Sequence, residues 1–267
     1  MKVLNYLVFV FLVCGCSGIV KKPEVFNVKR VAIISLQSNQ GVYNIREASG
    51  GNSFFSIPYI SKTNLPAEPS YLPETSGYRL VDFSLNTFEE ELSKIKGWQI
   101  VPSIKVINSA QYKVFGRSIQ FQPTRSIATE AATKKWFTPQ GMWPISNSRS
   151  ELVKEISKMA NDLNIDAVAL VTLDFAYSPD HASANNLGAS GSFASVATSI
   201  QIITKSGGTV VTTPDVSRGN GERFSSDISS PLLGKQMTFN DEVETMFKSA
   251  IQKSAINLRE KINKEFL

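Results

Sequence analysis

Two apolar runs, residues 31–36 and 167–173, constrain the fold of this chain most strongly. Both are rich in β-branched residues, and in neither do polar residues alternate regularly with apolar ones. A strand with one solvent-exposed face shows such an alternation, whereas a strand covered on both faces does not. We therefore predict two central strands of a sheet that has helices on both of its faces.

Amphipathic segments that can supply these helices lie between and after the two runs. The first segment repeats apolar residues at helical spacing, at Leu85, Phe88, Leu92 and Ile95. Asp82 or Ser84 is its expected N-cap, and Gly97 is expected to end it in the left-handed conformation. Residues 98–102 then indicate a short strand, and the alternating apolar residues of 103–108 indicate its continuation.

Two further helices are predicted in the second half of the chain. A capping-box pattern at Ser148 and Glu151 opens one of them. Its buried stripe would comprise Leu152, Ile156, Met159, Ala160 and Leu163. The last helix covers residues 241–266, with a stripe of Val243, Phe247, Ala250, Ile251, Leu258 and Ile262. We expect this stripe to pack on the chain's own sheet rather than on a partner.

A hairpin completes the pattern. Residues 193–204 alternate, residues 205–208 (Lys-Ser-Gly-Gly) form a tight turn, and residues 209–213 return. The order is therefore strand, helix, strand, helix, strand, hairpin, helix. This order predicts an α/β fold, as a single three-layer domain with a mixed sheet, long loop insertions and a long C-terminal helix.

The long loop insertions are predicted at residues 37–79 and 109–148. The first is rich in Gly, Ser, Asn, Pro and Tyr and shows no sustained period. The second carries many aromatic residues, namely Tyr112, Phe115, Phe121, Trp136, Phe137 and Trp143. Long loops within a compact domain often carry function. Both insertions are therefore candidate contact regions for a partner, with local packing of the aromatic residues as the alternative.

The beginning of the chain carries a separate signal. Lys2 supplies a positive charge. Residues 3–13, which are apolar apart from Asn5 and Tyr6, form a stretch shorter than the ~20 residues of a membrane span. The branched residue Val13 lies three positions before Cys16, and the small residue Gly15 lies directly before it. This arrangement resembles the signal of bacterial lipoproteins, which implies cleavage between Gly15 and Cys16 and acylation of Cys16. An uncleaved anchor and an ordinary secretory signal are the alternatives.

The lipoprotein resemblance divides the chain into a signal peptide (1–15), a lipidated tether (16–27) and the α/β domain (28–267). It implies an exported protein that the acyl chains on Cys16 hold in a membrane of the cell envelope. Two or three chains would anchor it stably, since one chain binds only marginally. Ser17, at the position where Asp usually signals retention at the inner membrane, favours the outer membrane.

Four segments of the domain resemble the envelope α/β lipoproteins: residues 28–34, 85–101, 163–171 and 196–211. That group includes the curli secretion channel family, the amino-terminal domain of the Tol translocation periplasmic protein, and lipoprotein activators of penicillin-binding proteins. The resemblance implies a non-enzymatic binding or assembly module for envelope proteins or for the cell wall. The main alternative is a subunit of an outer-membrane secretion channel, which would be an oligomer. An envelope hydrolase is a third hypothesis.

Residue chemistry gives no support for catalysis or for a cofactor. His181 is the only histidine, and no nucleophile elbow accompanies it in the sequence. The two cysteines both lie in the signal region, so no disulfide is expected in the domain. Asp162, Asp166 and Asp174 lack the spacing of a calcium loop, and we therefore expect no metal site.

The charge distribution argues against nucleic acid as a partner. The formal net charge is +5, a small excess for 267 residues, and the basic residues are dispersed. A nucleic-acid surface carries a basic stripe with interleaved aromatic residues. The expected partners are therefore the membrane, through the acyl chains on Cys16, and an envelope protein.

Overall fold

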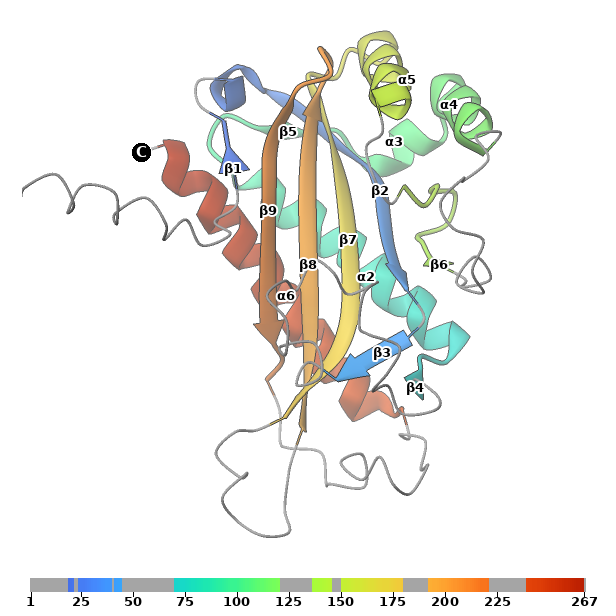
Figure 1. Cartoon of the computed structure of the whole chain (residues 1–267), viewed down its shortest axis with the longest axis vertical. Coiled ribbons are helices and arrows are strands. Elements are labelled where there is room, and N and C mark those ends of the chain that lie inside the picture. Colours follow the sequence, from blue (N-terminus) through green and yellow to red (C-terminus); the bar gives the residue numbers. More distant parts are fainter. Residues whose placement is uncertain are drawn as a thin grey trace, which may run out of the picture.

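A mixed β-sheet lies between two layers of helices (Figure 1). The computed structural model describes residues 19–21, 24–39, 41–44, 70–120, 136–145, 150–179, 192–220 and 239–266. Within these residues the chain has the three-layer α/β architecture that the sequence predicts, and a long helix lies near its C-terminus.

The two apolar runs form the centre of the sheet. β2 (Arg30–Asn39) and β7 (Ala167–Pro179) are parallel neighbours. On β2, Val31 and Ile33 face one helical layer and Ala32 faces the other, and all three are fully buried. The prediction of central strands that are covered on both faces is confirmed.

Antiparallel strands extend the sheet on one side of this pair. β8 (Ser192–Thr204) pairs with β7 along its whole length, and β9 (Thr209–Arg218) pairs with β8. A short strand, β1 (Ile19–Val20), pairs with β9 at that edge. On the other side β5 (Gln99–Ile100) runs parallel to β2, which gives the order β1-β9-β8-β7-β2-β5. The predicted hairpin is confirmed, although its second strand is longer than predicted.

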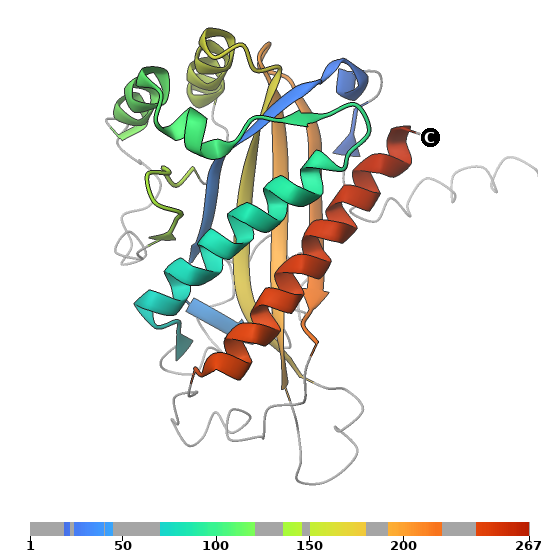
Figure 2. The same cartoon turned by 180° about the vertical axis from the view of Figure 1, so that it is seen from behind.

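Two long helices cover one face of the sheet. α2 (Glu74–Ser93) and α6 (Asp241–Asn263) cross it side by side (Figure 2), and a short 3-10 turn, η6 (Lys264–Phe266), follows α6. The Asn240 side chain caps α6 by accepting a hydrogen bond from the Val243 amide (2.9 Å). With the strands, these helices bury the main apolar core. The predicted stripe of α6 packs on the chain's own sheet, as expected.

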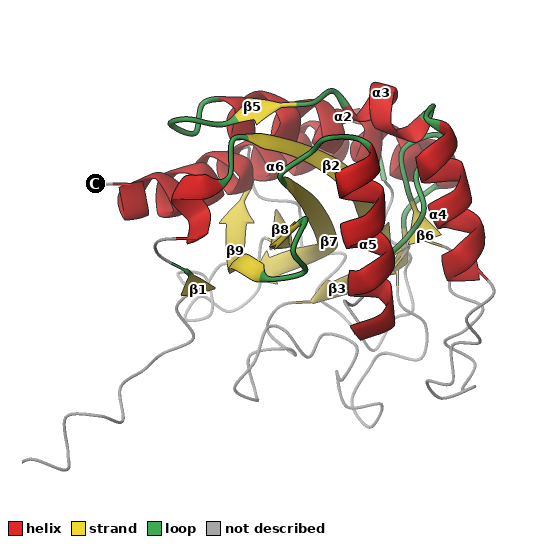
Figure 3. Ribbon diagram, turned by 90° about the horizontal axis from the view of Figure 1, so that it is seen from above, coloured by secondary structure: helices red, strands yellow, loops and turns green. Residues whose placement is uncertain are grey.

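Shorter helices cover the other face of the sheet near β2 and β7. They are α3 (Ser103–Ile107), α4 (Ala110–Gln120) and α5 (Ser150–Asp162), and they lie on the side away from β1 (Figure 3). They bury a second, smaller apolar cluster against the sheet. The predicted stripe of α5 is buried except at Leu163, which is half-buried. The predicted cap at Ser148 lies outside the described residues.

The first amphipathic helix begins earlier than predicted. α2 starts at Glu74, so that Asp82 and Ser84 lie inside it rather than at its cap. The Ser84 hydroxyl donates a hydrogen bond to the Leu80 carbonyl (2.6 Å), one turn back in the helix. Small residues on the buried face of α2 interrupt its apolar period: Ser76, Gly77 and Ser84. Because of these residues, apolar spacing does not predict the first half of the helix.

The chain after α2 forms a turn, a strand and a further helix. Gly97 lies in this turn with a φ of 84°, the left-handed conformation predicted for it. The predicted short strand is present as β5, but its predicted continuation at residues 103–108 is wrong, because α3 forms there. Pro102 has no amide hydrogen with which to continue a strand ladder. The Glu89 carboxylate instead accepts a hydrogen bond from the Ser103 amide (2.6 Å) at the start of α3.

Both predicted insertions contain regular structure. Residues 37–79 include the end of β2, the start of α2, and the paired strands β3 (Gly41–Asn44) and β4 (Ser70–Tyr71). Residues 109–148 include α4 and β6 (Trp136–Phe137), which pairs with the end of β2. The three strands are too short to show a period of two in the sequence. Much of both insertions lies outside the described residues.

Candidate functional site

The predicted acylation signal and the start of the sheet lie close together along the chain. Gly15 and Cys16 themselves lie outside the described residues. Ile19, three positions after Cys16, already pairs with Thr212 of β9. The structure therefore differs from the predicted tether of residues 16–27, because strand pairing has begun by Ile19.

The segment after β1 is held by backbone hydrogen bonds and by one apolar side chain. The Lys21 amide donates to the Val210 carbonyl (2.8 Å), and the Val25 amide donates to the Lys21 carbonyl (3.0 Å). A 3-10 turn, η1 (Glu24–Asn27), then brings Val25 into the main core, where it is fully buried. Two adjacent apolar residues in a short turn give no periodic signal, which explains why the sequence indicated a tether.

Aromatic and lysine side chains gather where this segment meets the C-terminus. The rings of Phe26 and Phe266 meet edge to face, with 5.1 Å between their centroids, and Phe26 remains 44% exposed. A shallow pocket of ≈ 340 Å³ beside them is lined by Phe26, Val28, Lys29, Lys96, Gly97 and Phe266. We refer to these six residues as the terminal surface. β1 and the C-terminus lie at the same corner of the molecule in Figures 1 and 3.

Asp166 fixes the start of the two central strands. Its carboxylate accepts hydrogen bonds from the amides of Lys29 (3.2 Å) and Arg30 (2.9 Å), and it forms an ion pair with Lys205 (3.1 Å) in the turn between β8 and β9. Partial burial raises the pKa of Asp166, but the hydrogen bonds from Arg30, Lys205 and Lys29 outweigh burial and hold the pKa below its ordinary value. These partners give Asp166 a structural role.

A metal site and a membrane-spanning helix are both absent from the part of the chain that the structure describes. Nowhere in it do three or more His, Cys, Asp or Glu side chains lie close enough to hold a metal ion. None of its helices is both long and apolar enough to cross a membrane. Asp162 and Asp174 lie on different elements, α5 and β7, and His181 lies outside the described residues.

The described aromatic residues of the second insertion pack onto the domain. The Tyr112 hydroxyl donates to the Ile34 carbonyl (2.7 Å) and accepts a hydrogen bond from the Trp143 amide (2.9 Å). Burial raises the pKa of Tyr112, and its phenol therefore stays protonated. Phe115 and Phe137 are buried as well. These side chains follow the local-packing alternative, and of them only Phe115 also lines a groove at the surface.

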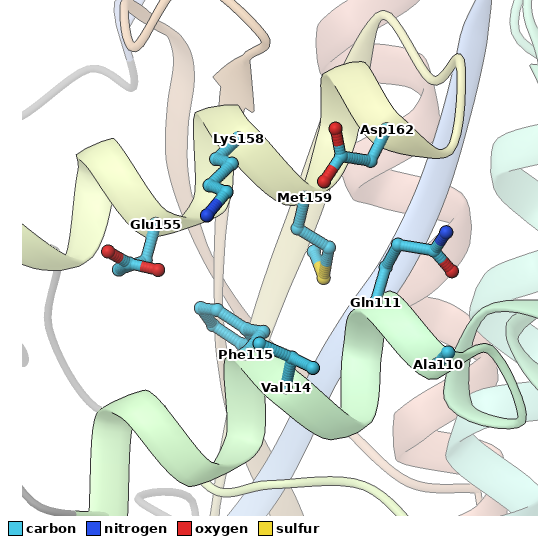
Figure 4. A pocket seen from close by; sticks show the side chains of 8 residues that line it. All are labelled: Ala110, Gln111, Val114, Phe115, Glu155, Lys158, Met159 and Asp162. Carbon is cyan, nitrogen blue, oxygen red and sulfur yellow. The ribbon is translucent and has the colours of Figure 1, made fainter.

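A groove between α4 and α5 exposes apolar side chains on the same helical layer (Figure 4). It has a volume of ≈ 250 Å³ and is lined by Ala110, Gln111, Val114, Phe115, Glu155, Lys158, Met159 and Asp162. Phe115 and Met159 are buried at its floor, whereas Val114 is 59% exposed. In Figure 4 the charged side chains come from α5 and face the apolar side chains of α4. This α4–α5 groove has the chemistry to hold an apolar side chain of a partner beneath a charged rim.

No protein-family model matches the chain, and no curated protein is significantly similar to it. A proposal about function therefore rests on the residues of this chain and on their geometry.

Proposed function

We propose that this chain is a lipoprotein of the bacterial cell envelope, acylated at Cys16, whose domain is a non-enzymatic binding or assembly module. The observation that carries the proposal is the sequence Val13-Cys14-Gly15-Cys16 behind a short apolar stretch, followed within three residues by the paired strand β1. A lipid on Cys16 would hold the folded domain directly at a membrane surface.

The acyl chains would supply the membrane affinity. Each buried methylene contributes about 0.8 kcal/mol, so that two or three acyl chains hold a protein stably whereas one does not. Ser17 in place of Asp supports an outer-membrane location within this proposal.

The α4–α5 groove is the candidate contact site for an envelope protein. Its buried apolar floor and charged rim resemble the core and rim of protein interfaces. The groove lies on the opposite side of the molecule from β1 and the C-terminus (Figures 1 and 3). An anchor at Cys16 would therefore leave the groove accessible to a partner in the envelope.

Fatty-acid labelling in cells tests the anchor. We expect the wild-type chain to incorporate a labelled fatty acid and Cys16→Ala to lose the label completely, because the acylated thiol is absent. Cys14→Ala is the matched control, since it removes the other cysteine of the chain and should keep the label. Label retained by Cys16→Ala, or lost in Cys14→Ala alone, contradicts acylation at Cys16.

Photocrosslinking in intact cells tests the contact site. A photoreactive residue at Val114 should give one discrete adduct with an envelope protein, and Lys158→Glu in the same chain should weaken that adduct several-fold. Val216, which is 47% exposed on β9, is the control position and should give no such adduct. Identical adducts from both positions, or no adduct from Val114, would show that the groove is not the contact site.

A further inference from the structure

We infer that the terminal surface rests on the phospholipid headgroups of the leaflet that holds the acyl chains of Cys16. This inference rests on the proposed acylation and deepens it, because it states which face of the domain meets the membrane. It follows from the length of chain between Cys16 and the sheet, and from the side chains that lie beside that point.

The short chain between Cys16 and β1 limits how far the domain can stand from the membrane. Ile19 is the third residue after Cys16 and is paired in the sheet. An extended chain spans at most about 3.6 Å per residue, so the Cα atoms of these two residues lie no more than about 11 Å apart. The edge of the sheet at β1 and the segments packed beside it are therefore the parts of the domain nearest to the leaflet.

The terminal surface is built from three segments that meet beside β1. η1 follows β1 after Lys21 and carries Phe26, whose ring contacts that of Phe266 at the C-terminal end. The Lys96 amide donates a hydrogen bond to the Asn263 side chain (3.2 Å), which joins the turn after α2 to the end of α6. Figure 2 shows the end of α2 and the end of α6 side by side at the same end of the molecule.

The side chains of the terminal surface suit a headgroup layer. Phe26 is 44% exposed, and aromatic rings are favoured at the boundary between headgroups and acyl chains. Lys29 and Lys96 are exposed, and neither ammonium group forms an ion pair with another residue that the structure describes. Such lysines are attracted to the phosphates of an anionic leaflet.

Lysines also prevail in the segments that adjoin this surface. Lys21 and Lys264 are both exposed there, and Glu24 and Glu265 are the acidic residues of η1 and η6. Together with Lys29 and Lys96, the described residues of these segments include four lysines and two glutamates. The charge of this end of the domain therefore complements anionic lipid.

Fluorescence quenching in vesicles tests the inference. The mature chain contains no cysteine besides Cys16, so that an introduced cysteine is the one free thiol once Cys16 is acylated. The acylated mature chain with Lys96→Cys carries the fluorophore, in vesicles of equal parts phosphatidylethanolamine and phosphatidylglycerol with a quencher on the headgroups. Val114→Cys, at a position that is 59% exposed on α4, is the matched control.

We expect quenching at position 96 to be several-fold stronger than at position 114, and the difference to shrink in neutral phosphatidylcholine vesicles. Equal quenching at both positions in a chain that is acylated and bound to vesicles overturns the inference and leaves the lipid anchor standing. A difference that is unchanged in neutral vesicles overturns the role of Lys29, the lysine of the terminal surface that this variant retains. An unmodified Cys16, found by mass spectrometry, overturns the proposed function and this inference with it.

Discussion

Asp166 joins three parts of the sheet through one carboxylate: the start of β2, the start of β7 and the turn between β8 and β9. The sequence does not indicate the partners of Asp166. Arg30, which donates through its amide, lies 136 positions away along the chain. Only the parallel pairing of β2 with β7 brings the two residues together.

Asp166→Asn should lower the stability of the fold at neutral pH and remove part of its acid sensitivity. Because the pKa of Asp166 is below its ordinary value in the folded chain, the ionised carboxylate adds stability above the unfolded-state pKa. That contribution is lost as the pH falls through the folded-state pKa. We expect a loss of about 1 kcal/mol at neutral pH, since the ion pair is partly exposed to solvent.

Urea denaturation of both chains over a series of pH values measures this difference. The two stability curves should converge in strong acid, where the wild-type carboxylate is protonated as well. Asp162→Asn, at an exposed position of α5, is the control and should leave the stability at neutral pH unchanged. A difference between wild type and Asp166→Asn that grows as the pH falls contradicts the stabilising role of the ionised carboxylate.

At the scale of helices and strands, the sequence predicts the elements that have a regular apolar pattern. β2, β7, the β8–β9 hairpin, α5 and α6 are found where that pattern lies. The first half of α2 was not predicted, because Ser76 and Gly77 occupy its buried face and interrupt the apolar pattern. α3 was not predicted as a helix, because it is short and its apolar residues alternate as those of a strand do.

The candidate site was predicted only where its signal is local in the sequence. The pattern that ends at Cys16 is contiguous, and so is the aromatic-rich stretch at 109–148. The residues of the terminal surface are not contiguous in the sequence, because folding brings Phe26, Lys96 and Phe266 together from distant segments. Within the second insertion, the described aromatic rings are largely packed inward, so aromatic content indicated packing onto the domain rather than an exposed contact surface.

α2 and α6 are also joined by ion pairs on buried carboxylates. Glu91 of α2 bonds to Arg259 of α6 (2.6 Å), and Glu244 of α6 bonds to Arg79 of α2 (2.6 Å). Lys94 gives Glu91 a second cationic partner (2.6 Å). Since a buried carboxylate is costly without its partners, these pairs help to set how the two helices cross.

Arg259→Ala should lower the free energy of unfolding by about 1–3 kcal/mol, because the buried Glu91 carboxylate would keep only Lys94 as a cationic partner. Lys94→Ala is the matched control on the same carboxylate. The Lys94 side chain is 45% exposed, and we expect its loss to cost less than about 1 kcal/mol. Chemical denaturation of the wild type and the two variants measures both effects. A larger loss of stability for Lys94→Ala than for Arg259→Ala would show that the Glu91–Arg259 pair is not the stronger one.

At the scale of the whole molecule, β1, which follows the proposed anchor in the sequence, and the proposed contact site lie on opposite sides of the molecule (Figures 1 and 3). β1, whose first residue is the third after Cys16 in the sequence, lies at one edge of the sheet, whereas α4 and α5 cover the sheet near β2 and β7. A chain held at Cys16 would thus rest on its terminal surface and present the α4–α5 groove away from the leaflet. With the proposed anchor at Cys16, the short connection to β1 would restrict the domain to such an orientation.

Mass spectrometry of the protein purified from cell membranes tests the lipid anchor most directly. We predict an N-terminal peptide that begins at Cys16 and carries the added mass of a lipid with two or three acyl chains. A peptide that begins at Met1, or one that begins at Cys16 without added mass, would contradict the anchor on which the proposed function depends.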